Sequence, residues 1–302
     1  MDTRPIEWIT TGIFWDSSSP VLALADRAGN PNNVPVAPGD RVAVCLGGPR
    51  RCVGWWLPEA GRRRPCPQGR EIAAAGGVAQ CETCSASDPG RAFARDEIHD
   101  DGRRHALYLA WFGPQLLKVG MTAVERGADR LAEQGAIAYV WIGSGSRPAV
   151  RHLEQRVSAA RIAPQRRRRP EKVTAWWSPS SAASRAGELA TARRLVQGLA
   201  SDDITPLGPE VHDNFDQFGI ASLPDSYDEL TDLAADAALV GTVLIACGRD
   251  LLIDLVGAGP TLVDSRLLAG RPTSPAIADR TAGIVAVART RPRSPDADDT
   301  LF

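Results

Sequence analysis

The strongest constraint on the fold is a group of four cysteines around a segment that has too few apolar residues to build its own core. Residues 58–103 are rich in Gly, Pro, Arg and Cys and show little periodicity. Cys81 and Cys84 form a CxxC pair, which Cys52 and Cys66 precede. Two thiolates at this spacing can share one tetrahedral ion, with each sulfur about 2.3 Å from zinc. Because a metal would supply the folding energy that the segment lacks, we predict a structural Zn²⁺ held by these four thiolates.

The two remaining cysteines, Cys45 and Cys247, lie in strand-like apolar stretches and are interpreted as core residues. A redox-active pair is the competing hypothesis for Cys81 and Cys84. Such a pair normally opens a helix beside a strand, whereas this one lies in a loop-rich segment. The opening MDTRPIEWITTG has no basic start followed by an apolar run, so we expect a cytoplasmic protein, in which thiols stay reduced.

Hydrophobic patterning predicts strands at both ends of the chain and an α/β unit between them. Residues 5–57 show short apolar stretches separated by turn clusters such as AGNPNN and APGD, and residues 239–290 return to the same character. From residue 105 to 162 the order is β-β-α-β-α: strands in HALYLAWF, LLKVGMT and GAIAYVWIG, and helices in AVERGADRLAEQ and AVRHLEQRVSAARI. A third helix is expected at 182–200. No stretch approaches the ~20 apolar residues of a membrane span.

These patterns together predict an α+β fold in three parts. The first is an N-terminal β-rich zinc-binding module at residues 1–103. An α/β core follows at 104–200, and an acidic, strand-rich region occupies 201–302.

Charge is distributed very unevenly along the chain. Residues 103–200 hold 17 Lys and Arg against 6 Asp and Glu, a net of +11, while residues 201–302 hold 7 Arg against 17 acidic residues, a net of −10. A basic segment of this size suits the phosphate backbone of DNA or RNA. The alternative is that the acidic third packs against the basic third. Lys118 and Lys172 are the only lysines, against 33 arginines, which indicates a general preference for arginine.

The central segment resembles a known nuclease superfamily. LYLAWFGPQLLKVGMT is similar to the two opening strands of the GIY-YIG superfamily: Tyr108 stands in the place of the GIY tyrosine, and Lys118-Val119-Gly120 stands in the place of YIG. Arg130 falls where the superfamily carries its helix arginine, and Glu154 where it carries its metal-binding glutamate. The short distance between these two, with the later Trp176-Trp177, most resembles the compact phage-type branch.

The whole chain also resembles a bacterial family known as a domain of unknown function. That family joins a CxG…CP…CxxC module to this core and adds a strand-rich C-terminal part. The resemblance covers residues 45–180 well and the rest weakly.

The superfamily resemblance implies metal-dependent cleavage of phosphodiesters. Tyr108 and Lys118 would handle the nucleophile, Arg130 would stabilise the phosphate, and Glu154 would hold Mg²⁺ or Mn²⁺. Lys118 replaces the second motif tyrosine, and a lysine there could donate to phosphate or, if desolvated, act as a base. Arg126 competes with Arg130, because the gap from Gly120 is longer than usual.

Each of these residues also has a purely structural interpretation. Glu154 lies within the apolar stripe of its helix, where a carboxylate needs either an arginine or an ion as partner. Arg130 can be a solvated helix residue, and Tyr108 a core residue. Residues 166–169, all arginine, form either a solvated loop or, with Trp176 and Trp177, a platform for phosphate contact and base stacking.

Three functions follow from these observations. The first is metal-dependent hydrolysis or processing of nucleic acid by the core at 104–200, supported by a structural zinc. The second is nucleic-acid binding without catalysis. The third is a GIY-YIG-like scaffold that carries out small-molecule chemistry in the same pocket.

Overall fold

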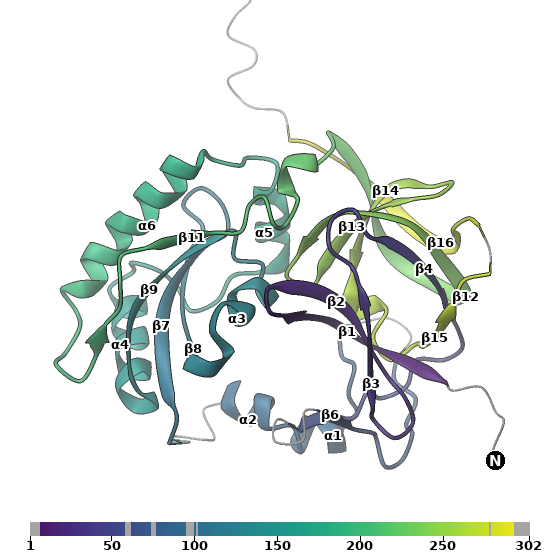
Figure 1. The fold of residues 1–302 in the computed structure, drawn as a ribbon, viewed down its shortest axis with the longest axis horizontal. Helices are drawn as coiled ribbons and strands as arrows, with labels where there is room; N and C mark the ends of the chain where they lie inside the picture. The colour runs from purple at the N-terminus through teal and green to yellow at the C-terminus, as the bar shows by residue number, and fades with distance from the viewer. Residues whose placement is uncertain are drawn as a thin grey trace, which may run out of the picture.

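The computed structural model describes residues 7–57, 62–73, 77–94, 100, 102–277 and 279–292. Within these residues the fold is mixed α and β with more strand than helix, built on a nine-stranded sheet, a five-stranded sheet and a two-stranded ribbon. In Figure 1 the five-stranded sheet and its helices lie on the left, the nine-stranded sheet lies on the right, and the cysteine-containing segment lies below them. None of the described helices is both long and apolar enough to cross a bilayer.

The nine-stranded sheet is built from both ends of the chain. Its order is β13-β14-β12-β4-β15-β1-β2-β3, and β16 pairs with β12. The strands are β1 (Trp8–Asp16), β2 (Ser19–Ala25), β3 (Pro31–Pro35), β4 (Arg41–Leu46), β12 (Ser226–Cys247), β13 (Asp250–Leu255), β14 (Gly259–Asp264), β15 (Pro272–Pro275) and β16 (Ala282–Thr290).

The contact between the two ends is a regular antiparallel ladder. Strand β4 pairs with residues 237–242 of β12, and β15 pairs with both β4 and β1. The expected N-terminal module and C-terminal region therefore share one sheet and one hydrophobic core. The strands that the sequence predicts from residue 239 begin earlier: β12 starts at Ser226, because it pairs with β16 from that residue onward.

The α/β unit lies between these two halves of the large sheet in sequence. Its sheet has the order β10-β9-β7-β8, with β11 beside β9. The strands are β7 (Arg104–Trp111), β8 (Leu117–Ala123), β9 (Ala138–Ser146), β10 (Thr205–Pro206) and β11 (Val211–Asp213); the helices are α3 (Gly127–Glu133), α4 (Arg147–Ala159), α5 (Arg169–Ala175) and α6 (Ala182–Gln197). Short 3-10 turns lie at Val124–Arg126, Ile220–Ser222 and Ser265–Leu267.

The predicted β-β-α-β-α order is confirmed in β7, β8, α3, β9 and α4, and the third helix in α6. Helix α4 begins where the sequence predicts: the Ser146 hydroxyl accepts from the Ala149 amide, and Pro148 occupies the first turn. Helix α5 was not predicted: Arg169, interpreted from the sequence as part of a loop or of a binding platform, is its first residue.

One continuous core joins the two sheets. Trp15 of β1 is fully buried, its Nε1 donates to the Gly248 carbonyl at 2.7 Å, and its ring meets Phe218 edge-on at 5.2 Å. Gly135 and Gly248 meet at this junction, and a Cβ on Gly248 would lie 2.9 Å from the Gly135 amide nitrogen. Glycine is needed here, and the close approach places the end of α3 against the turn between β12 and β13.

Candidate metal centre and basic pocket

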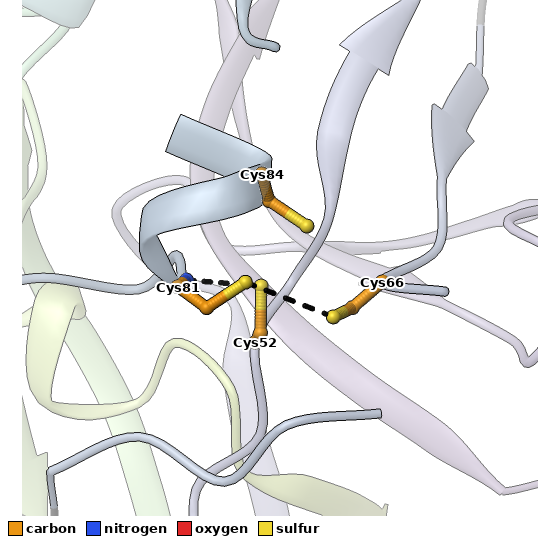
Figure 2. A group of neighbouring side chains, drawn as sticks. All are labelled: Cys52, Cys66, Cys81 and Cys84. Atoms are coloured by element: carbon orange, nitrogen blue, oxygen red, sulfur yellow. Dashed lines mark hydrogen bonds between the residues drawn. The ribbon is translucent and has the colours of Figure 1, made fainter. Parts of the chain in front are cut away.

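The four predicted cysteines converge on one point (Figure 2). Their Sγ atoms all lie within 4.8 Å of one another, and those of Cys66 and Cys81 are 3.9 Å apart. Tetrahedral coordination with zinc–sulfur bonds of about 2.3 Å requires sulfur–sulfur distances of about 3.8 Å. Together with Cys52 and Cys84 they form a site that can hold a metal ion such as zinc.

Two short elements present these thiols. Cys52 precedes strand β5 (Trp55–Leu57) and Cys66 follows its partner β6 (Arg62–Arg64), so the ribbon brings two distant cysteines together. The other pair lies at the start of helix α1 (Glu82–Ala86), with Cys81 at its N-cap and Cys84 fully buried; α2 (Pro89–Ala94) follows.

Backbone amides favour the thiolate forms of Cys52 and Cys66, while burial raises the pKa values of Cys52 and Cys84 above their usual range. The Gly54 and Cys81 amides point at the Cys52 sulfur, at 3.4 and 3.2 Å. Gly54 has φ +66°, and a Cβ there would fall 1.9 Å from the Arg64 carbonyl oxygen, so glycine is required. Burial opposes ionisation of Cys66, but amide donors from the loop after it lower its pKa to about 7. All four thiols are free of disulfides, so the donor set fits a soft cation.

The other cysteines lie in strands, as predicted: Cys45 in β4, half-buried, and Cys247 at the end of β12, buried. Burial raises the pKa of Cys247 well above its usual value. It is therefore a neutral core thiol.

Tyr108 and Lys118 meet through a third residue that sequence reasoning missed. Tyr108 is buried in β7, and its hydroxyl accepts from Lys118 Nζ at 3.2 Å and from Gln134 Nε2 at 2.6 Å. Lys118 Nζ also donates to Gln134 Oε1 at 2.5 Å. The side chain of Tyr108 lies against Gly120, and a Cβ atom on Gly120 would lie 2.3 Å from the tyrosine hydroxyl oxygen. The motif glycine is thus needed for this tyrosine to fit.

Arg130 lies beside this triad without joining it through its side chain. Its carbonyl accepts from Gln134 Nε2 at 3.3 Å, while its guanidinium pairs with Glu133 at 3.2 Å and is 41% exposed. Arg126, the competing arginine, pairs with the same glutamate at 2.6 Å. Both arginines therefore share Glu133, and Arg130 retains donors that face solvent.

Glu154 belongs to a different face of the sheet. Helix α4 packs Val150 and Leu153 into a hydrophobic cluster that also contains Leu107 of β7. Leu107 and Tyr108 are neighbours in this strand, so their side chains lie on opposite faces of the sheet, and Tyr108 belongs to a separate cluster. Glu154 itself is buried and forms an ion pair with Arg151. The structure therefore brings Tyr108, Lys118 and Arg130 into one neighbourhood but does not add Glu154 to it. Within the part of the chain that the structure describes, the cysteine site is the one cluster of three or more metal-ligating side chains.

A basic pocket of about 300 Å³ opens next to Gln134 and Arg130. It lies where α3 and α5 face the β12–β13 turn. Five cationic and two acidic side chains line it: Arg130, Arg167, Arg169, Lys172, Arg249, Glu133 and Asp250. Gln134, Gly135, Trp176, Cys247 and Gly248 complete the wall.

Arg169 anchors this pocket to the large sheet. Its Nε lies 2.6 Å from Asp250 and 3.3 Å from Asp264, and its Nη1 lies 2.8 Å from Glu229. Burial alone would lower the pKa of Arg169, but the three carboxylates raise it above its usual value. Its Nη2 is buried and has no hydrogen-bond partner among the described residues, so one donor is left for a ligand or water.

Lys172 and Asp250, which also line the pocket, have pKa values that burial shifts. Burial, and next the charge of Lys118, lower the pKa of Lys172 to about 8. Its Nζ donates to the Gln134 carbonyl at 2.8 Å and lies 3.8 Å from the centre of the Phe112 ring. Burial raises the pKa of Asp250 to about 6, although Arg169 acts in the opposite direction.

The tryptophans are not a stacking surface. Trp176 and Trp177 are both buried, and Trp177 stacks on Tyr227 at 4.9 Å. Of the two interpretations of residues 166–169, the base-stacking platform with Trp176 and Trp177 is therefore wrong, since both indoles are buried. The expected contact between acidic and basic thirds does occur, at Arg169 with its carboxylates and at Arg185 with Asp213.

Fold and site together define a mixed α/β protein with a four-cysteine cluster that can hold a metal ion and a basic pocket. A family model described as a protein of unknown function (DUF2797) matches residues 40–270, and the chain belongs to this family. The match spans the cysteines, the α/β unit and the pocket. No curated protein and no solved structure matches the sequence.

Proposed function

We propose that this chain is a zinc protein that binds phosphate groups of nucleic acid in the basic pocket, on a GIY-YIG-like scaffold. The observation that carries the proposal is the pocket itself: five cationic side chains against two acidic ones around about 300 Å³. Planar guanidinium groups match phosphate oxygens, and a concave site concentrates their field.

Zinc would be held by Cys52, Cys66, Cys81 and Cys84, with no open coordination position. A four-thiolate shell is typical of structural sites. Its contribution would be to fold the segment that lies beneath the two sheets in Figure 1.

Hydrolysis is the second candidate, and one observation favours it: Tyr108, Lys118 and Arg130 gather on the same side of the sheet. Two observations weigh against it. Tyr108 is 1% exposed and lies behind Gln134, away from the pocket lining, and Glu154 lies with α4 on the other face. We therefore favour binding without cleavage by this set of residues.

Anisotropy of fluorescein-labelled DNA and RNA oligonucleotides tests the binding. Arg130→Gln and Arg167→Gln should each weaken binding about tenfold at low salt, because a charged hydrogen bond contributes about 1.5 kcal/mol or more. The matched control is Arg166→Gln, an exposed neighbour that does not line the pocket. Affinity should also fall steeply with salt as counterions are released.

Three results separate the candidates. Equal losses in Arg166→Gln and Arg167→Gln would point to a diffuse basic surface and overturn the pocket. Binding that does not change with salt would overturn phosphate recognition. Cleavage of the labelled strands with Mg²⁺ or Mn²⁺, abolished by Glu154→Ala, would restore the hydrolase.

A further inference from the structure

The pocket contains an amine in a chain that otherwise uses guanidinium groups. Of 35 basic residues, 33 are arginine, and the two lysines lie together: Lys118 donates to the side chain of Gln134 and Lys172 to its carbonyl. A guanidinium stays protonated in proteins, whereas an amine can lose its proton and become a nucleophile. Lys172 lines the pocket and Lys118 does not.

The surroundings of Lys172 suit a reactive amine. Its Nζ lies over the Phe112 ring at 3.8 Å, and Trp176 and Cys247 form the adjacent wall. The Phe112 ring face and the Gln134 carbonyl stabilise the ammonium form, but burial outweighs both contacts and lowers the pKa of Lys172, so the neutral amine is accessible near neutral pH. Cys247 is held as a neutral thiol and does not compete as a nucleophile.

The remaining wall specifies what else the reactive molecule must carry. Arg130, Arg167 and Arg249 line the same pocket, and Arg169 has an unpartnered buried Nη2. An amine on its own would select any aldehyde, but one surrounded by guanidinium groups selects an aldehyde that bears an anion. The volume of about 300 Å³ is large enough for a small sugar phosphate.

We propose that Lys172 forms an imine with an aldehyde that carries a phosphate ester bound by the arginines of this pocket. The inference rests on the proposed phosphate-binding function of the same pocket. The Lys172 nitrogen attacks the carbonyl carbon, and its two hydrogens leave with the carbonyl oxygen as water, so a C=N bond replaces C=O and no oxidant is needed. The aldehyde is either an opened abasic sugar in a nucleic acid or a free sugar phosphate.

The charged groups around Lys172 set its pH dependence. Lys118 from β8 and Arg249 from the β12–β13 turn lower its pKa, Asp250 acts in the opposite direction, and burial dominates. Imine formation should therefore rise as pH passes through about 8, where the neutral amine becomes the main form. A lysine with an ordinary pKa would respond only near pH 10.

Borohydride trapping on the full zinc-loaded chain tests the proposal. The probes are glyceraldehyde 3-phosphate, glyceraldehyde at the same concentration, and an oligonucleotide with one abasic site. Reduction should leave one adduct on Lys172, heavier than the protein by the mass of the aldehyde less one oxygen atom. Peptide mapping of the wild type distinguishes Lys172 from Lys118 and the N-terminus without any variant.

We expect the phosphorylated aldehyde to give roughly tenfold more adduct than glyceraldehyde, matching one charged hydrogen bond. Lys172→Arg should abolish the adduct, whereas Lys118→Arg, at a position outside the pocket lining, should keep both the adduct and oligonucleotide binding. Adduct with the abasic strand alone assigns the ligand to nucleic acid, and adduct with the sugar phosphate alone assigns it to a metabolite.

Equal trapping of both small aldehydes, or no adduct on Lys172 while the oligonucleotide still binds, overturns the imine but leaves the proposed function standing. Loss of binding and of trapping in the wild type overturns both.

Discussion

The cysteine centre and the basic pocket are two sites built on opposite principles. All four thiols come from residues 52–84, and short local elements present them. The pocket takes its wall from three segments far apart in sequence, at 130–135, 167–176 and 247–250. A local site can be recognised from spacing, whereas an assembled site exists only once the two sheets have come together.

The two sites also differ in what stabilises them. With the proposed zinc bound, the cysteine centre would contribute its own folding energy, since its thiolates would gain a metal that the unfolded chain does not hold. The pocket gathers cations and a buried carboxylate, so the surrounding scaffold must stabilise it. Arg169 shows how: three carboxylates of the large sheet hold an arginine of the α/β unit.

Removing the metal ligand with the greatest burial should have the largest effect. Cys84→Ser should lower the melting temperature by about 10 °C or more and expose residues 52–94 to limited proteolysis, because a structural metal supplies several kcal/mol. Cys45→Ser, which changes a half-buried thiol outside the site, is the matched control. Elemental analysis of purified protein should find one Zn²⁺ per chain.

We also predict that the effect of Cys84→Ser is confined to the cysteine-containing segment. Cys84→Ser protein should still bind oligonucleotide at temperatures where the sheets remain folded. Loss of oligonucleotide binding together with the metal, while both sheets remain folded, would show that the two sites are coupled and not independent.

Removal of Arg169, which joins the pocket to the large sheet, should have the second largest effect on stability. Arg169→Gln leaves Asp250, Asp264 and Glu229 without their shared cation, so the free energy of unfolding should fall by about 3 kcal/mol. Arg168→Gln is the control, since this neighbour is exposed and pairs only with Glu171 at 3.1 Å. Arg168→Gln should lower the free energy of unfolding, measured in urea, by less than about 1 kcal/mol. Equal losses would mean that the carboxylates do not depend on Arg169.

The sequence predicts the local features of the molecule well. The cysteine set, the β-β-α-β-α order and the start of α4 all follow from spacing, alternation and capping within short windows. The position of Cys247 at the end of a buried strand follows from its apolar neighbours.

Features that depend on residues far apart in the sequence could not be predicted in this way. The pairing of β4 with β12 joins residues almost 200 apart, and no local pattern specifies it. Trp176 and Trp177 sit beside four arginines in the sequence, yet their indoles are buried because Tyr227 and the core close over them. Lys172 carried one signal that could have been used, since it is one of two lysines in an arginine-rich chain.

The triad of Tyr108, Lys118 and Gln134 tests whether the motif residues are structural. Tyr108→Phe should lower the free energy of unfolding by about 1–2 kcal/mol, because buried donors of Gln134 and Lys118 lose their acceptor. Tyr139→Phe is the control: this tyrosine belongs to the same cluster, and its hydroxyl has no hydrogen bond among the described residues. Oligonucleotide affinity should be unchanged in both. A loss of affinity confined to Tyr108→Phe would place the tyrosine in the ligand site.

The smallest expected effect is a change in pH dependence at Asp250. Burial raises its folded pKa to about 6, above its ordinary value of 3.8, so the folded chain binds more protons between those values. Its contribution to stability is therefore fully present below about pH 4 and is lost as pH rises through about 6. Asp264 and Glu229, whose pKa values are lowered, act in the opposite direction, so the difference between wild type and Asp250→Asn isolates the one group. We expect the wild type to gain about 1 kcal/mol relative to Asp250→Asn between pH 7 and pH 5.5 in urea unfolding. Asp254→Asn, an exposed position on the same strand, should show no such difference. A wild type that instead loses stability relative to Asp250→Asn over this range would mean that Arg169 outweighs burial, and that the pocket is held by a conventional ion pair.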